Sequence, residues 1–519
     1  MKLYRSFLTV GGMTMVSRVL GFARDILIAA VLGTGAVADA YFVAFRFPNL
    51  FRRLFAEGAF NAAFVPLFAK RLEGEGRAAA RDFAEQALAI LLAALLVTTA
   101  LAELAMPWLM YLIAPGFADS PEKFDLAVLL TRIAFPYLLF VSLVALLSGL
   151  LNALGRFALA AAAPMLLNVV LIGVLSSVAL AGWGDSPRAG IAITWGVAAA
   201  GLLQLVVLGL WARHVGFGLK LRAPKISDDM RRLIRLGIPG VIAGGITQVN
   251  IVIGTIIASL QDSAVSWLYY ADRIYQLPLG IVGIAIGVVL LPELSKQLRA
   301  DDGDGALSSL NRSLEFSMLL TLPAAIALMV APTPIIQVLF ERGAFGSADT
   351  PATAAALMAF AAGLPAFVVI KVLSPAFFAR EDTRTPMIYA GVSVAVNVVG
   401  SLALFFLIGH VGIAVATSLA GWTNAGLLAF TLTRRGAFKL DERLRRLVWP
   451  ILLSCAGMAG FLLFAAAGLG ERFAPDNGLL VQVGALGLLV LGGLVVYGAA
   501  CQLTGAVRLP ALLKSLTRR

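Results

Sequence analysis

The chain has 519 residues, of which 60% are hydrophobic and only 13% are charged, and its formal net charge is +12. A soluble protein of this length would carry roughly 25% charged residues to keep its surface hydrated. The composition therefore argues against a soluble enzyme or a soluble nucleic-acid-binding protein, and it predicts that most of the chain lies in a lipid bilayer.

Long stretches without Asp, Glu, Lys or Arg recur along the chain and mark the expected membrane spans. About 20 apolar residues are enough to cross the hydrocarbon core of a bilayer. The sequence predicts an all-α polytopic membrane protein with about fourteen transmembrane helices. They are expected near residues 7–33, 37–70, 83–112, 125–153, 157–183, 188–212, 230–260, 264–297, 309–338, 350–379, 385–409, 412–433, 446–470 and 477–503.

The basic residues indicate on which side of the membrane the chain ends lie. If the N-terminus is cytoplasmic, 29 of the 41 Lys and Arg fall on the side of both termini, five on the opposite side and seven within spans. Because cytoplasmic loops carry the excess of basic residues, we expect both termini in the cytoplasm. The net charge is then explained by topology and by contact with anionic lipids, not by nucleic acid. The five opposite-side residues are Lys123, Arg132, Arg188, Arg342 and Arg472.

The cysteine count and the first segment exclude two other classes. Cys455 and Cys501 both fall within predicted spans, so neither a disulfide framework nor a metal site is expected. Arg18 interrupts the first apolar segment, which we interpret as a retained helix and not as a signal peptide. No catalytic residue and no cofactor are predicted.

The two halves of the chain resemble each other at a separation of 226–229 residues. Equivalent positions are Pro66 and Pro292, Pro136 and Pro365, and Asn168 and Asn397. We therefore predict two six-helix lobes in parallel orientation, 1–218 and 219–440, followed by a C-terminal helix pair with a cytoplasmic tail, 441–519. Transporters with parallel repeats bind their substrate between the halves and alternate access by rocking.

Charged residues occur inside the first, second and eighth predicted spans, where exposure to lipid is costly. An arginine that faces lipid costs at least about 2.5–3.5 kcal/mol, so six would cost on the order of 15–20 kcal/mol. The charged side chains must therefore face one another or a watery cavity. They are Arg18, Arg24, Asp25, Asp39, Arg46, Arg52, Arg53, Glu57, Asp272 and Arg273.

The balance of these charges indicates an anionic ligand. Six arginines against four carboxylates leave two net positive charges, whereas a purely structural network would tend to neutrality because buried unpaired charge is costly. The guanidinium fork matches phosphate oxygens well. A pyrophosphate would balance the excess, and Arg24, Arg52 and Arg273 are the strongest candidates to bind it.

Internal ion pairs account for part of the set. Arg53 and Glu57 are four residues apart, so they can pair on one helix face. Arg52 points about 100° away and has no acid four residues before or after it, which makes it the better candidate for ligand binding. Asp25 lies two turns after Arg18 and is a candidate to orient that arginine instead of binding a ligand.

Several segments together resemble one family. They are SRVLGFARD (17–25), ADAY (38–41), FRFPNLFRRLFAEGA (45–59), YYADR with LPLG (269–280) and REDTRTP (380–386). These segments are similar to the amino-terminal signature, the eighth helix and the loop after the tenth helix of the MurJ/MviN lipid II flippases. That family belongs to the multidrug/oligosaccharidyl-lipid/polysaccharide exporter superfamily, and the resemblance extends over essentially the whole chain.

The resemblance implies a flippase that moves lipid II, a disaccharide-pentapeptide on undecaprenyl pyrophosphate, to the outer leaflet for peptidoglycan synthesis. It also implies that helices 13 and 14 frame a groove for the lipid tail. The residues expected to bind substrate are Arg18, Arg24, Asp25, Asp39, Asn49, Arg52 and Arg273. Those expected to orient them are Arg46, Arg53, Glu57 and Asp272.

The energy source and two rival functions stay open at this point. Helices 7 and 11 (236–260 and 385–409) contain no Asp or Glu, so the coupling ion is undetermined and the membrane potential is the simpler driver. One alternative is an exporter of another polyprenyl-linked oligosaccharide, such as an O-antigen unit. A membrane glycosyltransferase would need a catalytic carboxylate in an ordered loop, yet the largest outer loop, 114–125, is short. The cell-wall synthesis machinery is a candidate partner.

Overall fold

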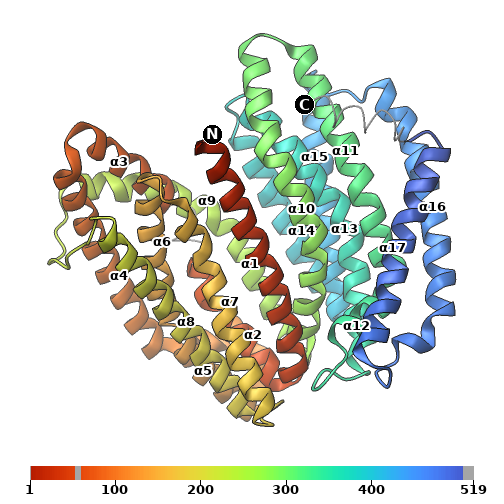
Figure 1. Ribbon diagram of the computed structural model, residues 1–519, viewed down its shortest axis with the longest axis horizontal. Coiled ribbons are helices and arrows are strands. Elements are labelled where there is room, and N and C mark those ends of the chain that lie inside the picture. Colours follow the sequence, from red (N-terminus) through yellow and green to blue (C-terminus); the bar gives the residue numbers. More distant parts are fainter. Residues whose placement is uncertain (1, 53–59, 507–519) are drawn as a thin grey trace. The chain divides into compact units, whose positions relative to one another are not determined.

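The structure, a computed structural model, describes residues 2–52 and 60–506. Contacts between helices divide the chain into two compact units. Unit 1 comprises Met1–Ser266 with Gly343–Phe345, and unit 2 comprises Trp267–Arg342 with Gly346–Arg519. Within the described ranges both units are built from helices alone (Figure 1), as expected for spans whose backbone groups must be hydrogen-bonded inside lipid.

Unit 1 contains the helices of the first half of the chain and the long helix that follows them. In this unit α1 packs against α7, α2 against α5, and α6 against α8, while α9 packs against α3 and α4. The helices are α1 (Lys2–Leu32), α2 (Ala36–Arg52), α3 (Phe60–Gly74), α4 (Gly76–Ile113), η2 (Pro115–Asp119), α5 (Pro121–Ala134), α6 (Tyr137–Ala153), α7 (Phe157–Leu180), α8 (Pro187–His214) and α9 (Asp228–Ala258).

Unit 2 contains the second half of the repeat and the C-terminal pair. Here α13 packs against α11 and α15, α14 against α15, and α16 against α11 and α17. The helices are α10 (Ala264–Arg299), whose first turn belongs to unit 1, α11 (Gly303–Val330), α12 (Pro332–Phe340), α13 (Asp349–Phe378), α14 (Arg384–Ile408), α15 (His410–Arg434), α16 (Glu442–Gly468), η3 (Gly470–Phe473) and α17 (Leu479–Leu503).

The all-α membrane fold is confirmed, and the described residues of each predicted span are almost entirely helical; residues 53–59 of the predicted span 37–70 lie outside the described residues. Two predicted spans are divided at proline: 125–153 into α5 and α6 before Pro136, and 309–338 into α11 and α12 before Pro332. Proline lacks the N–H that would continue the helical hydrogen bonds. Among the described residues, ten helical segments are long and apolar enough to cross a membrane. The total of fourteen spans stays a prediction.

The predicted lobes follow the sequence repeat, whereas the compact units follow packing. Because α9 packs against α3 and α4, it is counted with unit 1, although the repeat assigns it to the second half. The division into lobes at 1–218, 219–440 and 441–519 stays a prediction.

Two prolines inside helices leave backbone carbonyls that a side chain from another helix satisfies. In α4, Pro107 cannot donate to the carbonyl of Glu103, and Arg132 of α5 donates its Nε to that oxygen at 3.3 Å. In α11, Pro323 leaves the carbonyl of Leu319, which accepts a 2.8 Å hydrogen bond from the hydroxyl of Tyr497 on α17. An unpaired polar group inside a membrane costs free energy, so these bonds tie neighbouring helices at proline breaks.

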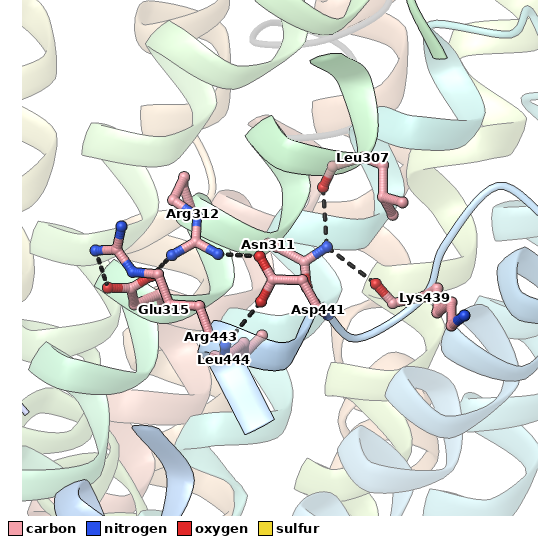
Figure 2. Close-up of polar contacts among 8 residues, drawn as sticks. All are labelled: Leu307, Asn311, Arg312, Glu315, Lys439, Asp441, Arg443 and Leu444. Carbon is pink, nitrogen blue, oxygen red and sulfur yellow. Dashed lines mark hydrogen bonds and ion pairs between the residues drawn. The ribbon is translucent and has the colours of Figure 1, made fainter. Parts of the chain in front are cut away.

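A second attachment joins the C-terminal pair to α11. Figure 2 shows Arg312 between Glu315 and Asp441, and Arg443 bonds Glu315 at 2.8 Å, so two arginines face two carboxylates. Beside them, Asn311 donates to the carbonyl of Lys439 at 3.0 Å and accepts from the backbone N–H of Asp441 at 3.2 Å. Asp441 also caps the first turn of α16. The start of α16 is therefore fixed to α11 by a charge-balanced cluster.

If the hydroxyl of Tyr497 replaces the hydrogen bond that Pro323 cannot make, it should contribute to stability only while residue 323 is proline. We expect Tyr497→Phe to lower the Tm of the purified protein by about 1–3 °C, because one net hydrogen bond is lost. In a Pro323→Ala background the N–H of residue 323 can bond the Leu319 carbonyl, so Tyr497→Phe should have no further effect. The measurement is thermal unfolding in detergent, with the exposed Tyr111→Phe as control. An equal loss in both backgrounds would show that Tyr497 acts through packing alone.

Candidate functional site

The described part of the predicted site begins with a buried ion pair on α1. Arg24 is 9% exposed and Asp25 3%, and the Nε and Nη2 atoms of Arg24 donate to Oδ1 of Asp25 at 3.1 and 2.7 Å. The third contact comes from α7, where Oδ1 of Asn168 accepts from Nη1 of Arg24 at 2.9 Å. Arg18, more than one turn earlier, is exposed. Asp25 thus contacts Arg24, its neighbour in the chain, where the helical spacing had suggested Arg18 as its partner.

On α2 the predicted residues lie at both ends of the helix. Arg46 is half-buried and donates its Nη1 to the hydroxyl of Thr255 on α9 at 3.0 Å. Asn49 donates to the carbonyl of Phe45, four residues earlier in the same helix, at 2.9 Å. Arg52 is the last residue of α2. Arg53 and Glu57 lie outside the described residues, so their pairing stays a prediction.

Asp39, in the first turn of α2, is fully enclosed by hydrogen-bond donors. Its side chain is 0% exposed and accepts from the Nζ of Lys123 at 2.9 Å and from the backbone N–H groups of Ser263 and Ser266, each at 3.0 Å. The hydroxyl of Ser266 donates to it as well. The Ser263 and Ser266 donors lie at the beginning of α10, so the carboxylate also meets the positive end of that helix. This geometry favours an orienting role for Asp39 over direct contact with a substrate.

Lys123 is the partner of Asp39 that sequence reasoning missed. Its ammonium lies between Asp39 and Asp262, 3.0 Å from the latter, and 4.4 Å from the centroid of the Phe117 ring. Lysine and aspartate are 84 residues apart in the chain, so no spacing rule connects them. The one sequence feature that could have drawn attention to Lys123 is its predicted position on the side of the membrane opposite the termini, where only five basic residues are expected.

The pairing of Lys123 leaves the charge balance of the arginine set unchanged. Counted with both of its acids, Asp39 and Asp262, Lys123 brings the set to seven basic and five acidic side chains. The excess stays at the two positive charges expected from the sequence.

In unit 2, Arg273 of α10 is half-buried beside an aromatic ring. Its guanidinium lies 4.6 Å from the centroid of the Tyr269 ring, one turn earlier, and 3.9 Å from Asp272. Asp272 also accepts a hydrogen bond from Gln276. When a guanidinium stacks on an aromatic ring, its N–H groups point outward in the plane of the guanidinium. They can then donate two hydrogen bonds to one oxyanion.

The motif loop after the tenth span forms a cap. Asp382 accepts from the backbone N–H of Thr385 at 2.9 Å, at the start of α14, and from Arg435 at 2.6 Å. These hydrogen bonds lower the pKa of Asp382 to about 2, and the bond from Arg435 has the largest effect. The carboxylate is therefore ionised at neutral pH and joins the ends of α13, α14 and α15. We assign this loop to stability and not to the ligand.

Among the residues that the structure describes, no group of three or more His, Cys, Asp or Glu is arranged to hold a metal ion. The chemistry of the set is that of arginines held by carboxylates, an amide and an aromatic ring. Such groups can bind an oxyanion by charge and hydrogen bonds.

Comparison with known proteins identifies the family. The family model "Lipid II flippase MurJ" matches residues 28–479. A protein of Rhizobium tropici named "Probable lipid II flippase MurJ" is 48% identical over 100% of this chain and 97% of its own length. The chain belongs to the MurJ family. A "Lipid II flippase MurJ" of Burkholderia cenocepacia is 35% identical over 90% of each chain.

Solved structures agree with this MurJ assignment. One titled "Lipid II flippase MurJ, inward closed conformation" has a TM-score of 0.77 at 25% identity and covers 95% of this chain and 98% of its own. An inward-facing multidrug transporter of the MATE family has a TM-score of 0.69 at 14% identity over 83% of this chain, which shows the shared fold alone. The resemblance drawn from the sequence segments is thereby confirmed for this MurJ-family chain.

The buried pair on α2 and α5 predicts a specific pattern of stability. Lys123→Met should destabilise the protein by about 3–5 kcal/mol, because it leaves the Asp39 carboxylate buried without its counter-charge. Adding Asp39→Asn should restore most of that loss. Asp262→Asn, which removes the 96% exposed partner of Lys123, is the matched control and should change stability little. Thermal unfolding and yield in membranes are compared for the wild type, the two single variants and the double variant. A double variant no more stable than Lys123→Met would contradict the pairing.

Proposed function

We propose that this protein moves lipid II from the cytoplasmic to the outer leaflet of a bacterial inner membrane by alternating access. Membership of the MurJ family supports the substrate class. The observation that carries the proposal is the buried Arg24, held by Asp25 and Asn168; the sequence adds an excess of six arginines over four carboxylates in the predicted spans. A large anionic headgroup is the kind of ligand that offsets such an excess.

The parts of lipid II match the charges available. The pyrophosphate carries two negative charges, for which Arg24 is already oriented by Asp25 and Asn168, and for which Arg18, Arg52 and Arg273 are further candidates. Asn49 is proposed to bind the headgroup, and Arg46 and Asp272 to orient their neighbours. Arginine suits these contacts because its fork meets two oxygens at once.

The lipid tail needs a different surface. We propose that α16 and α17 bind it, since many of their side chains are apolar and exposed, including Phe464 at 82% and Leu480 at 88%. The charge-balanced cluster of Figure 2 and the Tyr497 bond fix this pair to α11. The headgroup then stays among charged residues while the tail stays in lipid.

Topology follows from the distribution of charge. With 29 basic residues on one side and five on the other, we propose that both termini are cytoplasmic. We also propose that the protein has no enzymatic activity of its own, and that cell-wall enzymes which make and consume lipid II are its functional partners. Export of an O-antigen unit is the weaker alternative, because the family model and the relatives are named for lipid II.

The test is rapid depletion of the protein in living cells, followed by chemical labelling of lipid II on the outer face. We expect labelling to fall as lipid II accumulates on the cytoplasmic side, because the headgroup cannot cross the hydrocarbon core unaided. Restoration by plasmid-borne protein is the control. Unchanged labelling of lipid II, with loss of another lipid-linked glycan from the surface, would support the O-antigen alternative.

We propose that the membrane potential drives the cycle. A positive set of arginines at membrane depth feels about 2.3 kcal/mol per charge per 100 mV, whereas the loaded set is close to neutral. A potential negative inside therefore favours return of the empty carrier toward the cytoplasm.

Collapse of the potential with an ionophore, at constant sodium, should slow outer-face labelling of lipid II. Removal of sodium at constant potential should leave the rate unchanged. The reverse result would show that a sodium site is the driver and that the charge argument is insufficient.

A further inference from the structure

Asn168, a buried polar residue of α7, lies beside the arginine of the proposed headgroup site. It is 5% exposed, and both ends of its amide are bonded to α1. Its Oδ1 accepts from Nη1 of Arg24 at 2.9 Å, and its Nδ2 donates to the backbone carbonyl of Ser17 at 2.9 Å. The two bonds span the stretch of α1 between Ser17 and Arg24.

The partners leave one orientation for the amide. A guanidinium can only donate hydrogen bonds and a backbone carbonyl can only accept them, so the oxygen must face Arg24 and the nitrogen must face Ser17. An aspartate could not donate to the carbonyl, and an aliphatic side chain could make neither bond. Asparagine therefore fits this place by its chemistry as well as its size.

Asn168 restrains Arg24 in a way that Asp25 cannot. Asp25 follows Arg24 directly in α1 and contacts Nε and Nη2 through one oxygen, Oδ1. Asn168 holds the opposite corner, Nη1, from another helix. With contacts on both sides the plane of the guanidinium is fixed relative to the α1–α7 pair, which lowers the entropy lost when a bidentate oxyanion binds.

The equivalent residue of the second repeat contacts hydroxyl groups. Asn397 of α14 is 6% exposed, and its Oδ1 accepts from the hydroxyls of Ser401 and Thr417 at 3.4 and 3.2 Å. The bond from Thr417 joins α14 to α15. In the first repeat the same position contacts a cation.

We propose that Asn168 is a positioning residue that holds Arg24 for the pyrophosphate of the substrate. The inference rests on the proposed function, because it assigns Arg24 to the headgroup. It adds a residue outside the charged set, from a helix that sequence reasoning assigned no part in binding.

A double-mutant cycle on lipid II affinity tests this assignment with purified protein in detergent. Asn168→Ala should weaken binding roughly five- to tenfold, since a hydrogen bond to a charged group is lost. In an Arg24→Ala background the same substitution should change the dissociation constant less than about twofold. Asn397→Ala is the matched control, and its effect should be small and equal in both backgrounds.

Three outcomes overturn the proposal. If Asn168→Ala weakens binding equally with and without Arg24, the residue is only an interhelical contact. If Asn168→Ala alone leaves the affinity unchanged, it does not position Arg24. If Arg24→Ala itself leaves the affinity unchanged, the headgroup assignment fails and the positioning role fails with it, a result distinct from the other two. Should Asn168→Ala not be recovered as folded protein, Asn168→Thr replaces it in the cycle, because threonine fills similar volume and bonds its own helix backbone.

Discussion

The constraint on which the rest of this structure depends is that a charge inside a membrane or at its edge must meet a partner. The described residues satisfy it in three ways. Asp39 is met by an ammonium and three other donors, and Arg24 by a carboxylate and an amide. Arg132 is met by a backbone carbonyl that a proline has left without its helical donor. Each solution joins two or more helices, so the charges that are costly in lipid also determine which helices lie together.

The helices themselves were predictable because lipid enforces them. Uncharged stretches of about 20 residues can only become spans, and α13, α14 and α15 lie within a residue or two of the expected ranges. Helix breaks at Pro136 and Pro332 were not predicted. Hydropathy averages over a window of residues, whereas a break depends on a single missing N–H.

The sequence shows which charged residues stand in the predicted spans, but it does not show how they pair. The partner of Asp39 is Lys123, 84 residues away, and a second partner of Arg24, besides Asp25, is Asn168, 144 residues away. Periodicity along one helix reports only neighbours on that helix, so it suggested Arg18 for Asp25. Asn168 had drawn notice as a marker of the repeat, and its contact with Arg24 gives that position a chemical role.

Pairing within the site also bears on how a flippase releases its cargo. A bare arginine in a low-dielectric site would bind a pyrophosphate so strongly that release on the other side would be slow. In the proposed site Arg24 already has Asp25 at 2.7 Å, so part of its charge is offset before a phosphate arrives, and only the remaining attraction would appear as affinity. When the phosphate leaves, Asp25 is still in contact with Arg24 and no charge is left unpaired. An acid beside the arginine thus reduces the free-energy change at both loading and release, which a transporter needs more than tight binding.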